Sequence, residues 1–357
     1  MQVLHHTTPF QLESNAILPA LEIAYQTFGE LHPLKNNVVW VCHAFSGNTD
    51  PTDWWSGLIG KGRLLDPEHY FIVCANMLGS CYGTTGPASL HPETRQPYRQ
   101  QFPLVTIRDI VKVYQILQQH LEINRIRLIL GGSMGGQQAL EWAITDPNLF
   151  DQVCVMATNA RHSPWAIAFN ESQRMAIYAD QTLHEDSLNA GRKGLEAARA
   201  IAMLSYRHFH SYNATQQDEF DLLDDFRASS YQRYQGYKMW KRFNVFSYLT
   251  LSKAMDTHHV GRSRGGLHQA LKRITAPTLV VGVQSDLLFP VEEQKFLARH
   301  IPNASLEIIQ SIYGHDAFLI EYDQLTKYLG NFLREGIKKR SYLNGIVHTG
   351  MPGSEPF

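Results

Sequence analysis

Short runs of consecutive apolar residues recur along the chain, at residues 38–43, 70–75, 127–130, 152–157 and 278–283. Unbroken apolarity of this length is typical of strands that are buried on both faces, because a half-exposed strand would alternate. Segments with helical spacing, such as 107–121 and 137–145, separate several of these runs. The alternation predicts an α/β fold with a mostly parallel sheet and helices on both sides. Residues 20–28 are more mixed and fit an early antiparallel edge strand.

The rhythm of strands and helices is interrupted in the middle of the chain. From 162 to 270 we find no convincing buried strand, and the sequence there is helical and rich in Tyr, Gln, Arg and Met. We therefore predict an α/β core built from residues 1–160 and 273–334, with a helical lid inserted at 161–272. Both functional lids and partner-binding hairpins have this pattern. After Arg334 the periodicity is lost, and we expect 335–357 to form an irregular tail.

The segment from Gly131 to Gly135 carries the most informative chemistry. It reads G-x-S-x-G around Ser133, directly after an apolar run and directly before a helical segment. In that setting a serine occupies a sharp strand-to-helix turn with its hydroxyl raised above the sheet edge. Glycines are needed on both sides because a Cβ would strike the neighbouring strand or helix. The motif predicts a nucleophilic serine.

A serine hydroxyl needs a base to take its proton and an acid to orient that base. In hydrolases with this elbow the three residues come in the chain order Ser, Asp or Glu, His. Asp286 follows the predicted strand at 278–283, and His315 follows the apolar segment at 306–309. Both would stand at the carboxyl ends of strands. We predict that Ser133, Asp286 and His315 form a catalytic triad.

An oxyanion hole should take one backbone N–H from Met134, the residue after the nucleophile, and one from the loop after an early strand. Phe45 is our candidate for the second donor. His43 could serve as a second base, but a structural role is the better interpretation. Glu141 and Asp146 we assign to solvent or packing.

The overall composition excludes several function classes. Lys and Arg number 32 against 33 Asp and Glu, so no net charge recruits nucleic acid or an anionic membrane. No apolar run approaches the roughly 20 residues that cross a bilayer, and the N-terminus has no signal-peptide pattern. Four cysteines lie in or beside apolar runs, which is typical of buried thiols in a reducing compartment. We expect a cytoplasmic protein.

Over nearly all of residues 10–330 the chain resembles the homoserine O-acyltransferase family, chiefly its acetyltransferases. The resemblance rests on the elbow and on long, unusual strings that have no general physical reason to recur together. These strings are residues 78–87, 102–109, 168–171 and 230–236. The resemblance implies an α/β-hydrolase fold whose lid also pairs two subunits into a homodimer.

The same resemblance implies roles for three further residues. Arg199 matches a lid arginine that clamps the carboxylate of an amino acid, for which a guanidinium is well suited because it forms two parallel bonds. Asp316 matches the acid that receives the substrate ammonium. Tyr206 matches a tyrosine near the bound substrate. From the residues alone, Arg199 would be a helix-surface arginine and Asp316 an ordinary loop acid.

The implied reaction is a two-step acetyl transfer from acetyl-CoA to L-homoserine through an acyl-Ser133 intermediate. The product is O-acetyl-L-homoserine, a precursor for methionine synthesis. No metal or prosthetic group is needed, and acetyl-CoA acts as co-substrate. Many relatives have His-Ala-Leu-Thr-Gly where this chain has Phe45 and Ser46 at the third and fourth positions. That departure leaves the acyl donor open.

Three alternatives remain at this level. The same fold and triad could use succinyl-CoA or L-serine, since one methylene in a pocket is worth only about 1–3 kcal/mol. A plain esterase or thioesterase would share the triad, although it has no use for an amino-acid clamp. A catalytically dead binding protein with a hydrolase fold would not react with a serine-directed fluorophosphonate.

Overall fold

The computed structural model describes residues 1–185, 187 and 189–348. Its main element is an eight-stranded sheet in the order β1-β4-β6-β5-β7-β8-β9-β10. The strands are β1 (Gln2–His6), β4 (Leu21–Phe28), β5 (Val38–Cys42), β6 (Phe71–Ala75), β7 (Leu128–Gly132), β8 (Val153–Met156), β9 (Thr278–Val283) and β10 (Ala304–Ile309). From β6 to β10 all neighbours are parallel. The predicted mostly parallel sheet is confirmed.

The antiparallel strand predicted at 20–28 is present as β4, but it is not the edge of the sheet. β4 pairs antiparallel with β6 on one side and with β1 on the other, so β1 is the edge strand. β1 contains two histidines, and none of its residues is fully buried. An exposed edge strand carries little apolar signal, which is why the sequence pattern does not reveal it. A separate two-stranded ribbon joins β2 (Phe10–Gln11) to β3 (Ile17–Leu18).

Both faces of the sheet are covered, and this explains the unbroken apolar runs. Along β5, Trp40 packs into one core with α2 (Ile107–His120), α3 (Met134–Thr145) and α10 (Val291–His300). Val39 and Val41 point the other way, into a second core with α11 (Tyr322–His348) and the region after α1 (Pro51–Trp54). Successive residues of each central strand are therefore buried on opposite sides.

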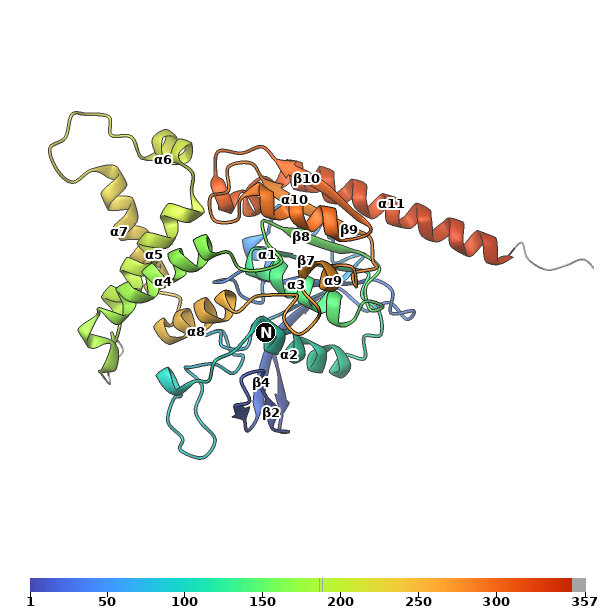
Figure 1. Cartoon of the computed structure of the whole chain (residues 1–357), viewed down its shortest axis with the longest axis horizontal. Coiled ribbons are helices and arrows are strands. Elements are labelled where there is room, and N and C mark those ends of the chain that lie inside the picture. The colour runs from blue at the N-terminus through green and yellow to red at the C-terminus, as the bar shows by residue number, and fades with distance from the viewer. Residues whose placement is uncertain (186, 188, 349–357) are drawn as a thin grey trace, which may run out of the picture.

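The helical insertion consists of α4 (Pro164–Tyr178), α5 (Arg192–Tyr206), α6 (Phe209–Gln216), α7 (Arg227–Trp240) and α8 (Val245–Asp256). It projects from one end of the sheet, at the left of Figure 1. α5 packs between α4 and α7, and Gly194 and Gly236 lie at these close contacts, where a Cβ would meet backbone atoms of the neighbouring helix. The lid range predicted at 161–272 contains these helices and also α9 (Leu267–Leu271), which contacts α10 of the core.

The end of the chain departs from the prediction. The expected irregular tail at 335–357 is wrong as far as His348, because α11 continues to that residue. The remaining residues of that prediction, 349–357, lie outside the described part of the chain. Among the described residues, no helix combines the length and apolarity needed to cross a bilayer.

Candidate active site

Ser133 occupies the sharp turn between β7 and α3. Its backbone φ is 57°, a left-handed conformation that strains a residue with a side chain. The turn is held by the Ser133 N–H, which donates to the Met156 carbonyl at 2.9 Å, and by the Thr158 hydroxyl, which donates to the Ser133 carbonyl at 2.8 Å. A Cβ on Gly131 would meet the backbone of Gly135, as the G-x-S-x-G argument requires.

The three predicted triad residues are brought together at the carboxyl ends of their strands. Ser133 Oγ lies 2.9 Å from His315 Nε2, and His315 Nδ1 lies 2.7 Å from Asp286 Oδ2. The other carboxylate oxygen, Asp286 Oδ1, accepts the backbone N–H groups of Leu288 and Phe289, each at 2.8 Å. This fixes the carboxylate, so that His315 carries its proton on Nδ1 and leaves Nε2 free to accept one from Ser133.

The environment of His315 favours its role as a base. All three triad residues are about 5% exposed or less. Burial by itself lowers the pKa of His315, but the adjacent Asp286 carboxylate outweighs it, so the pKa is raised above its ordinary 6.5. The imidazole is stacked on Phe289, with ring centres 5.1 Å apart, and Tyr206 lies on it at 5.7 Å. These rings hold the imidazole in one orientation.

Ser133 and His315 open into a pocket of about 280 Å³ between the core and the lid. Its remaining walls come from Ala44, Phe45, Ser46, Arg199, Tyr206, Arg207, Arg242, Asp316, Phe318, Leu319 and Ile320. The lining thus combines an apolar floor with three guanidinium groups and one carboxylate. A zwitterion or an anion suits such a pocket better than a neutral lipid does.

The loop after β5 lies where the oxyanion-hole prediction needs it. Phe45 and Ser46 line the same pocket as Ser133, while Met134 is the first residue of α3, so its N–H has no acceptor within the helix. The Phe45 ring packs edge-on against Tyr248 of α8, with ring centres 4.8 Å apart. The assignment of the two N–H donors stays a prediction.

His43 has the structural role that we favoured. It is fully buried, with Nδ1 2.9 Å from the Ala44 carbonyl and Nε2 accepting the Met77 N–H at 3.2 Å. Burial lowers its pKa to about 4. Glu141 lies in packing rather than in solvent, because it is 2% exposed and forms ion pairs with Arg108 and Arg264.

The three residues implied by the family resemblance meet on the lid side of the pocket. The Arg199 guanidinium carbon lies 5.1 Å from the centre of the Tyr206 ring. Asp316 follows His315 directly, and its carboxylate faces the Arg207 side chain, with Nε 3.1 Å from Oδ2. Burial raises the pKa of Asp316, while Arg207 and Arg199 act to lower it. A carboxylate and a guanidinium are therefore available on one wall.

Sequence reasoning missed two arginines of this site. Arg207 ends α5 beside Tyr206 and is the ion-pair partner of Asp316. Arg242 follows α7 and holds the loop after β5, donating to the Ser46 carbonyl at 2.6 Å and to the Ser46 hydroxyl at 3.0 Å. Neither belongs to a recognisable motif. The adjacency of Arg207 to Tyr206 was the only available signal.

The sequence is similar to a known fold family and to several enzymes with one shared name. A family model described as the alpha/beta hydrolase fold matches residues 37–322. The homoserine O-acetyltransferase of Cyclobacterium marinum is 47% identical, over 94% of this chain and 95% of the relative. Other relatives at 40–44% identity carry the same name, among them that of Chlorobium chlorochromatii, at 44% over 94% of this chain and 96% of its own.

Solved structures of both hydrolases and transferases share the fold. Esterase E22 superimposes with a TM-score of 0.85 at 23% identity, covering 93% of this chain and 99% of the esterase. The homoserine O-acetyltransferase from Bacillus anthracis gives 0.83 at 24% identity, covering 93% and 98%. At these identities the likeness shows the fold alone, and it does not distinguish hydrolysis from transfer.

Proposed function

The chain belongs to the homoserine O-acetyltransferase family within the α/β-hydrolase fold, and from this membership we propose that it transfers the acetyl group of acetyl-CoA to the side-chain hydroxyl of L-homoserine. The product is O-acetyl-L-homoserine, a precursor for methionine synthesis. The observation that carries the proposal is the combination, in one pocket, of a hydrogen-bonded Ser133–His315–Asp286 chain with side chains of both charges.

In the first step His315 Nε2 takes the proton of Ser133 while Oγ attacks the thioester carbonyl carbon of acetyl-CoA. The negative charge on the carbonyl oxygen is stabilised by the N–H groups of Phe45 and Met134. The C–S bond then breaks, the CoA thiolate takes the proton from His315, and Ser133 carries the acetyl group. No metal or prosthetic group takes part, because the triad supplies both nucleophile and base.

In the second step L-homoserine takes the place of CoA. Its carboxylate binds the Arg199 guanidinium and its ammonium binds Asp316, beside Tyr206. The bound side-chain hydroxyl gives its proton to His315 and attacks the acetyl carbon, and Ser133 leaves with that proton. Two opposite charges hold the acceptor so that its hydroxyl points toward the acyl-serine. A hydroxyl held in this way reacts much faster than water that meets the acyl-serine by random encounter.

Hydrolysis is the competing outcome, because water could release the same acyl-enzyme. The acceptor clamp favours transfer, since an esterase has no need of a carboxylate and a guanidinium in the same pocket as its nucleophile. The purified protein should therefore release CoA slowly from acetyl-CoA alone and much faster with L-homoserine, and mass spectrometry should identify O-acetyl-L-homoserine. Equal release with and without homoserine would indicate a thioesterase. If CoA is released only from succinyl-CoA, the proposed donor is wrong. If L-serine is acetylated instead of L-homoserine, the proposed acceptor is wrong.

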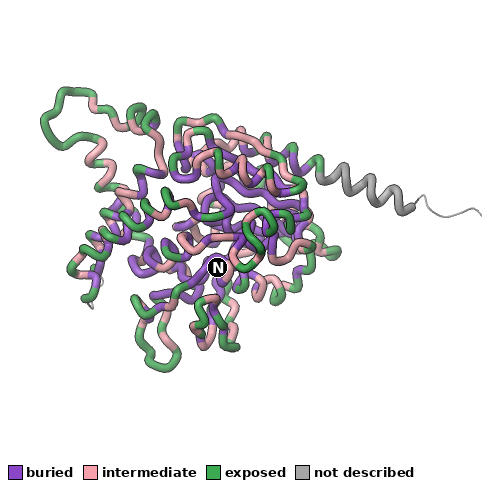
Figure 2. The backbone as a smooth tube through the Cα atoms, viewed as in Figure 1, coloured by how far each residue is buried: buried purple, intermediate pink, exposed green. Residues whose placement is uncertain are grey.

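We also propose that the protein works in the cytoplasm as a homodimer paired through the lid. All four cysteines are free thiols, as in a reducing compartment. α6, α7 and the loop between them expose large apolar side chains. The backbone of this region is mostly coloured as exposed, in green, in Figure 2. The apolar side chains are Phe209, Phe220, Leu222, Leu223, Phe226, Tyr234 and Tyr237, which we call the lid patch. Apolar patches of this kind mark interaction surfaces.

A further inference from the structure

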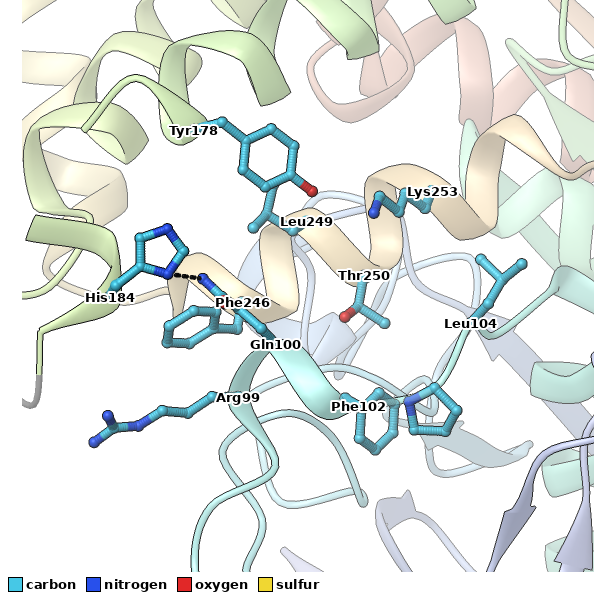
Figure 3. Close-up of a pocket in the computed structure, with 11 residues that line it drawn as sticks. Arg99, Gln100, Phe102, Leu104, Tyr178, His184, Phe246, Leu249, Thr250 and Lys253 are labelled. Atoms are coloured by element: carbon cyan, nitrogen blue, oxygen red, sulfur yellow. Dashed lines mark hydrogen bonds between the residues drawn. The ribbon is translucent and has the colours of Figure 1, made fainter. Parts of the chain in front are cut away.

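A second pocket, larger than the one at Ser133, lies on the other side of α8. It encloses about 490 Å³ and is bordered by Arg99, Gln100, Phe102, Pro103, Leu104, Tyr178, His184, Phe246, Leu249, Thr250 and Lys253. These residues come from the core segment 99–104 and from three parts of the lid: the end of α4, the 3-10 turn η2 (Gln181–His184) and α8. We call it the α8 pocket (Figure 3).

The α8 pocket and the acyl-transfer pocket are separated by the thickness of a helix. Phe246, Leu249 and Lys253 are spaced by three and four residues, so they share the face of α8 that borders the α8 pocket. Tyr248, two residues after Phe246, is turned by about 200° around the helix. Its ring packs on Phe45 of the loop after β5. A molecule in the α8 pocket would therefore not lie against Ser133.

The charged side chains that line the described part of the α8 pocket are positive. Two of its side chains, Arg99 and Lys253, are cationic, and none of the lining residues that the structure describes is acidic. Lys253 Nζ lies 5.8 Å from the centre of the Tyr178 ring, and no carboxylate among the described residues forms an ion pair with it. An ammonium group on an aromatic wall attracts a counter-anion into the same hollow.

The other walls are apolar and aromatic. The rings of Phe102, Tyr178 and Phe246 stand on different sides of the hollow (Figure 3). At its edge Gln100 Nε2 and His184 Nδ1 form a hydrogen bond of 3.1 Å, which joins the core segment to the lid. The volume lies in the range of sites for small organic molecules. An occupant needs a flat or apolar body for the rings and a negative group for Lys253.

We infer that the α8 pocket is a second binding site, separate from the acyl-transfer pocket, and that it takes a small organic anion with an aromatic or apolar body. A matched pair of fluorescent probes tests separately the need for a negative group and the need for an aromatic or apolar body. The anion 8-anilinonaphthalene-1-sulfonate carries a sulfonate, and N-phenyl-1-naphthylamine has the same rings without the charge. Both brighten on entering an apolar pocket, so their dissociation constants can be measured by titration of the full-length protein.

Two substitutions remove the two features of the α8 pocket. Lys253→Gln should weaken binding of the sulfonate roughly threefold to tenfold, as expected for the loss of one charge-assisted contact, and should leave the uncharged probe unchanged. Leu104→Trp, at a side chain that is 47% exposed, should fill the hollow and weaken both probes. Lys238→Gln is the control, because Lys238 also lies over a tyrosine ring, 5.9 Å from Tyr234, but outside the pocket.

The inference is overturned if Lys253→Gln and Leu104→Trp leave the sulfonate affinity unchanged, since the probe would then bind elsewhere, for example on the lid patch. It is also overturned if acetyl-CoA or L-homoserine displaces the sulfonate competitively, because the α8 pocket would then belong to the acyl-transfer site. Acetyl transfer by the Lys253→Gln variant is measured alongside. If the variant still transfers acetyl groups, a failure of the α8-pocket inference leaves the proposed function standing.

Discussion

At the scale of single residues, the site depends on how each charge is balanced by its neighbour. His315 is buried, and burial alone would lower its pKa and leave it a weak base. The Asp286 carboxylate, 2.7 Å from Nδ1, reverses that direction. Asp316 has the opposite problem, because burial favours its neutral form. The Arg207 guanidinium, 3.1 Å away, opposes this by favouring the carboxylate form, but the pKa of Asp316 is still raised above its ordinary value. In both cases the neighbouring charge acts against the effect of burial.

Asp286→Asn tests whether the Asp286 carboxylate raises the pKa of the buried His315. The rate of acetyl transfer should depend on neutral His315, so in the unsubstituted protein it should fall as the pH drops through a pKa above 6.5. Without the Asp286 carboxylate, burial is opposed only by the smaller effect of Asp316, so the pKa of His315 should fall and the midpoint should move to lower pH. The rate on the plateau should fall by about 10⁴-fold, as for a serine-protease triad whose Asp is replaced by Asn. A pH–rate profile of kcat/KM measures both, and an unchanged midpoint would contradict the role of Asp286.

Arg207→Gln tests whether the Arg207 guanidinium favours the charged form of Asp316. Asp316 should then protonate more readily and bind the homoserine ammonium less well, so the KM for L-homoserine should rise roughly tenfold or more, the effect of a lost charge-assisted bond. The burst of CoA from acetyl-CoA alone should keep its rate, because Ser133 is untouched. Arg192→Gln on the same helix, paired with Glu196 instead, is the control. A slower burst with an unchanged KM would mean that Arg207 only supports the fold.

At the scale of elements, the lid contacts the loop after β5, where we propose the oxyanion hole, and also lines the proposed acceptor clamp. Arg242, at the end of α7, donates to both oxygens of Ser46 and to the Tyr82 hydroxyl. Tyr248 of α8 supports the Phe45 ring. The backbone that we propose to donate to the oxyanion is thus held from the lid side. Such preorganisation matters because donors that are already oriented need no rearrangement during the reaction.

Arg242→Gln should loosen this loop and slow formation of the acetyl-enzyme about tenfold, part of the 10²–10³ that a whole oxyanion donor is worth. The loss should be the same with acetyl-CoA and with p-nitrophenyl acetate, which has no CoA portion. Lys241→Gln, one residue earlier, serves as the control. A loss confined to acetyl-CoA would instead show that Arg242 contacts the CoA portion of the donor.

How far each element could be predicted depends on what its residues touch. The strands buried on both faces, such as β5 and β9, and the elbow at Ser133 carry local signals, because burial and steric crowding restrict the residue type at each position. β1 carries no such signal because it is an exposed edge. Arg207 and Arg242 were missed because their partners, Asp316 and Ser46, lie about 100 and 200 residues away in sequence, and single-sequence patterns do not report distant pairs.

At the scale of the whole molecule, the lid has two sides with different partners. Its inner helices complete the acyl-transfer pocket, while α6 and α7 present the lid patch to solvent. Leu223 is fully exposed in the single chain. An apolar side chain in that position gains nothing from the fold of its own subunit, but it would gain from a second copy. The same lid would then join two active sites in one particle.

Leu223→Glu tests this arrangement, because a fully exposed side chain can be changed without disturbing its own fold. The account predicts that the unsubstituted protein sediments as a dimer and that Leu223→Glu shifts it toward the monomer, since a carboxylate would have to be desolvated in the interface. Leu34→Glu, at a side chain that is 74% exposed on the core, should stay dimeric. A monomeric unsubstituted protein, or equal behaviour of both variants, would contradict pairing through the lid patch.

The most direct test of the central claim follows the acetyl group itself. The protein is mixed with acetyl-CoA labelled in the acetyl group, freed of small molecules by rapid gel filtration, and then chased with L-homoserine. The account predicts that label stays with the protein, is absent in Ser133→Ala, and moves to O-acetyl-L-homoserine during the chase. Label that never attaches to Ser133, or that leaves only as acetate whether or not homoserine is present, would contradict acetyl transfer through an acyl-enzyme.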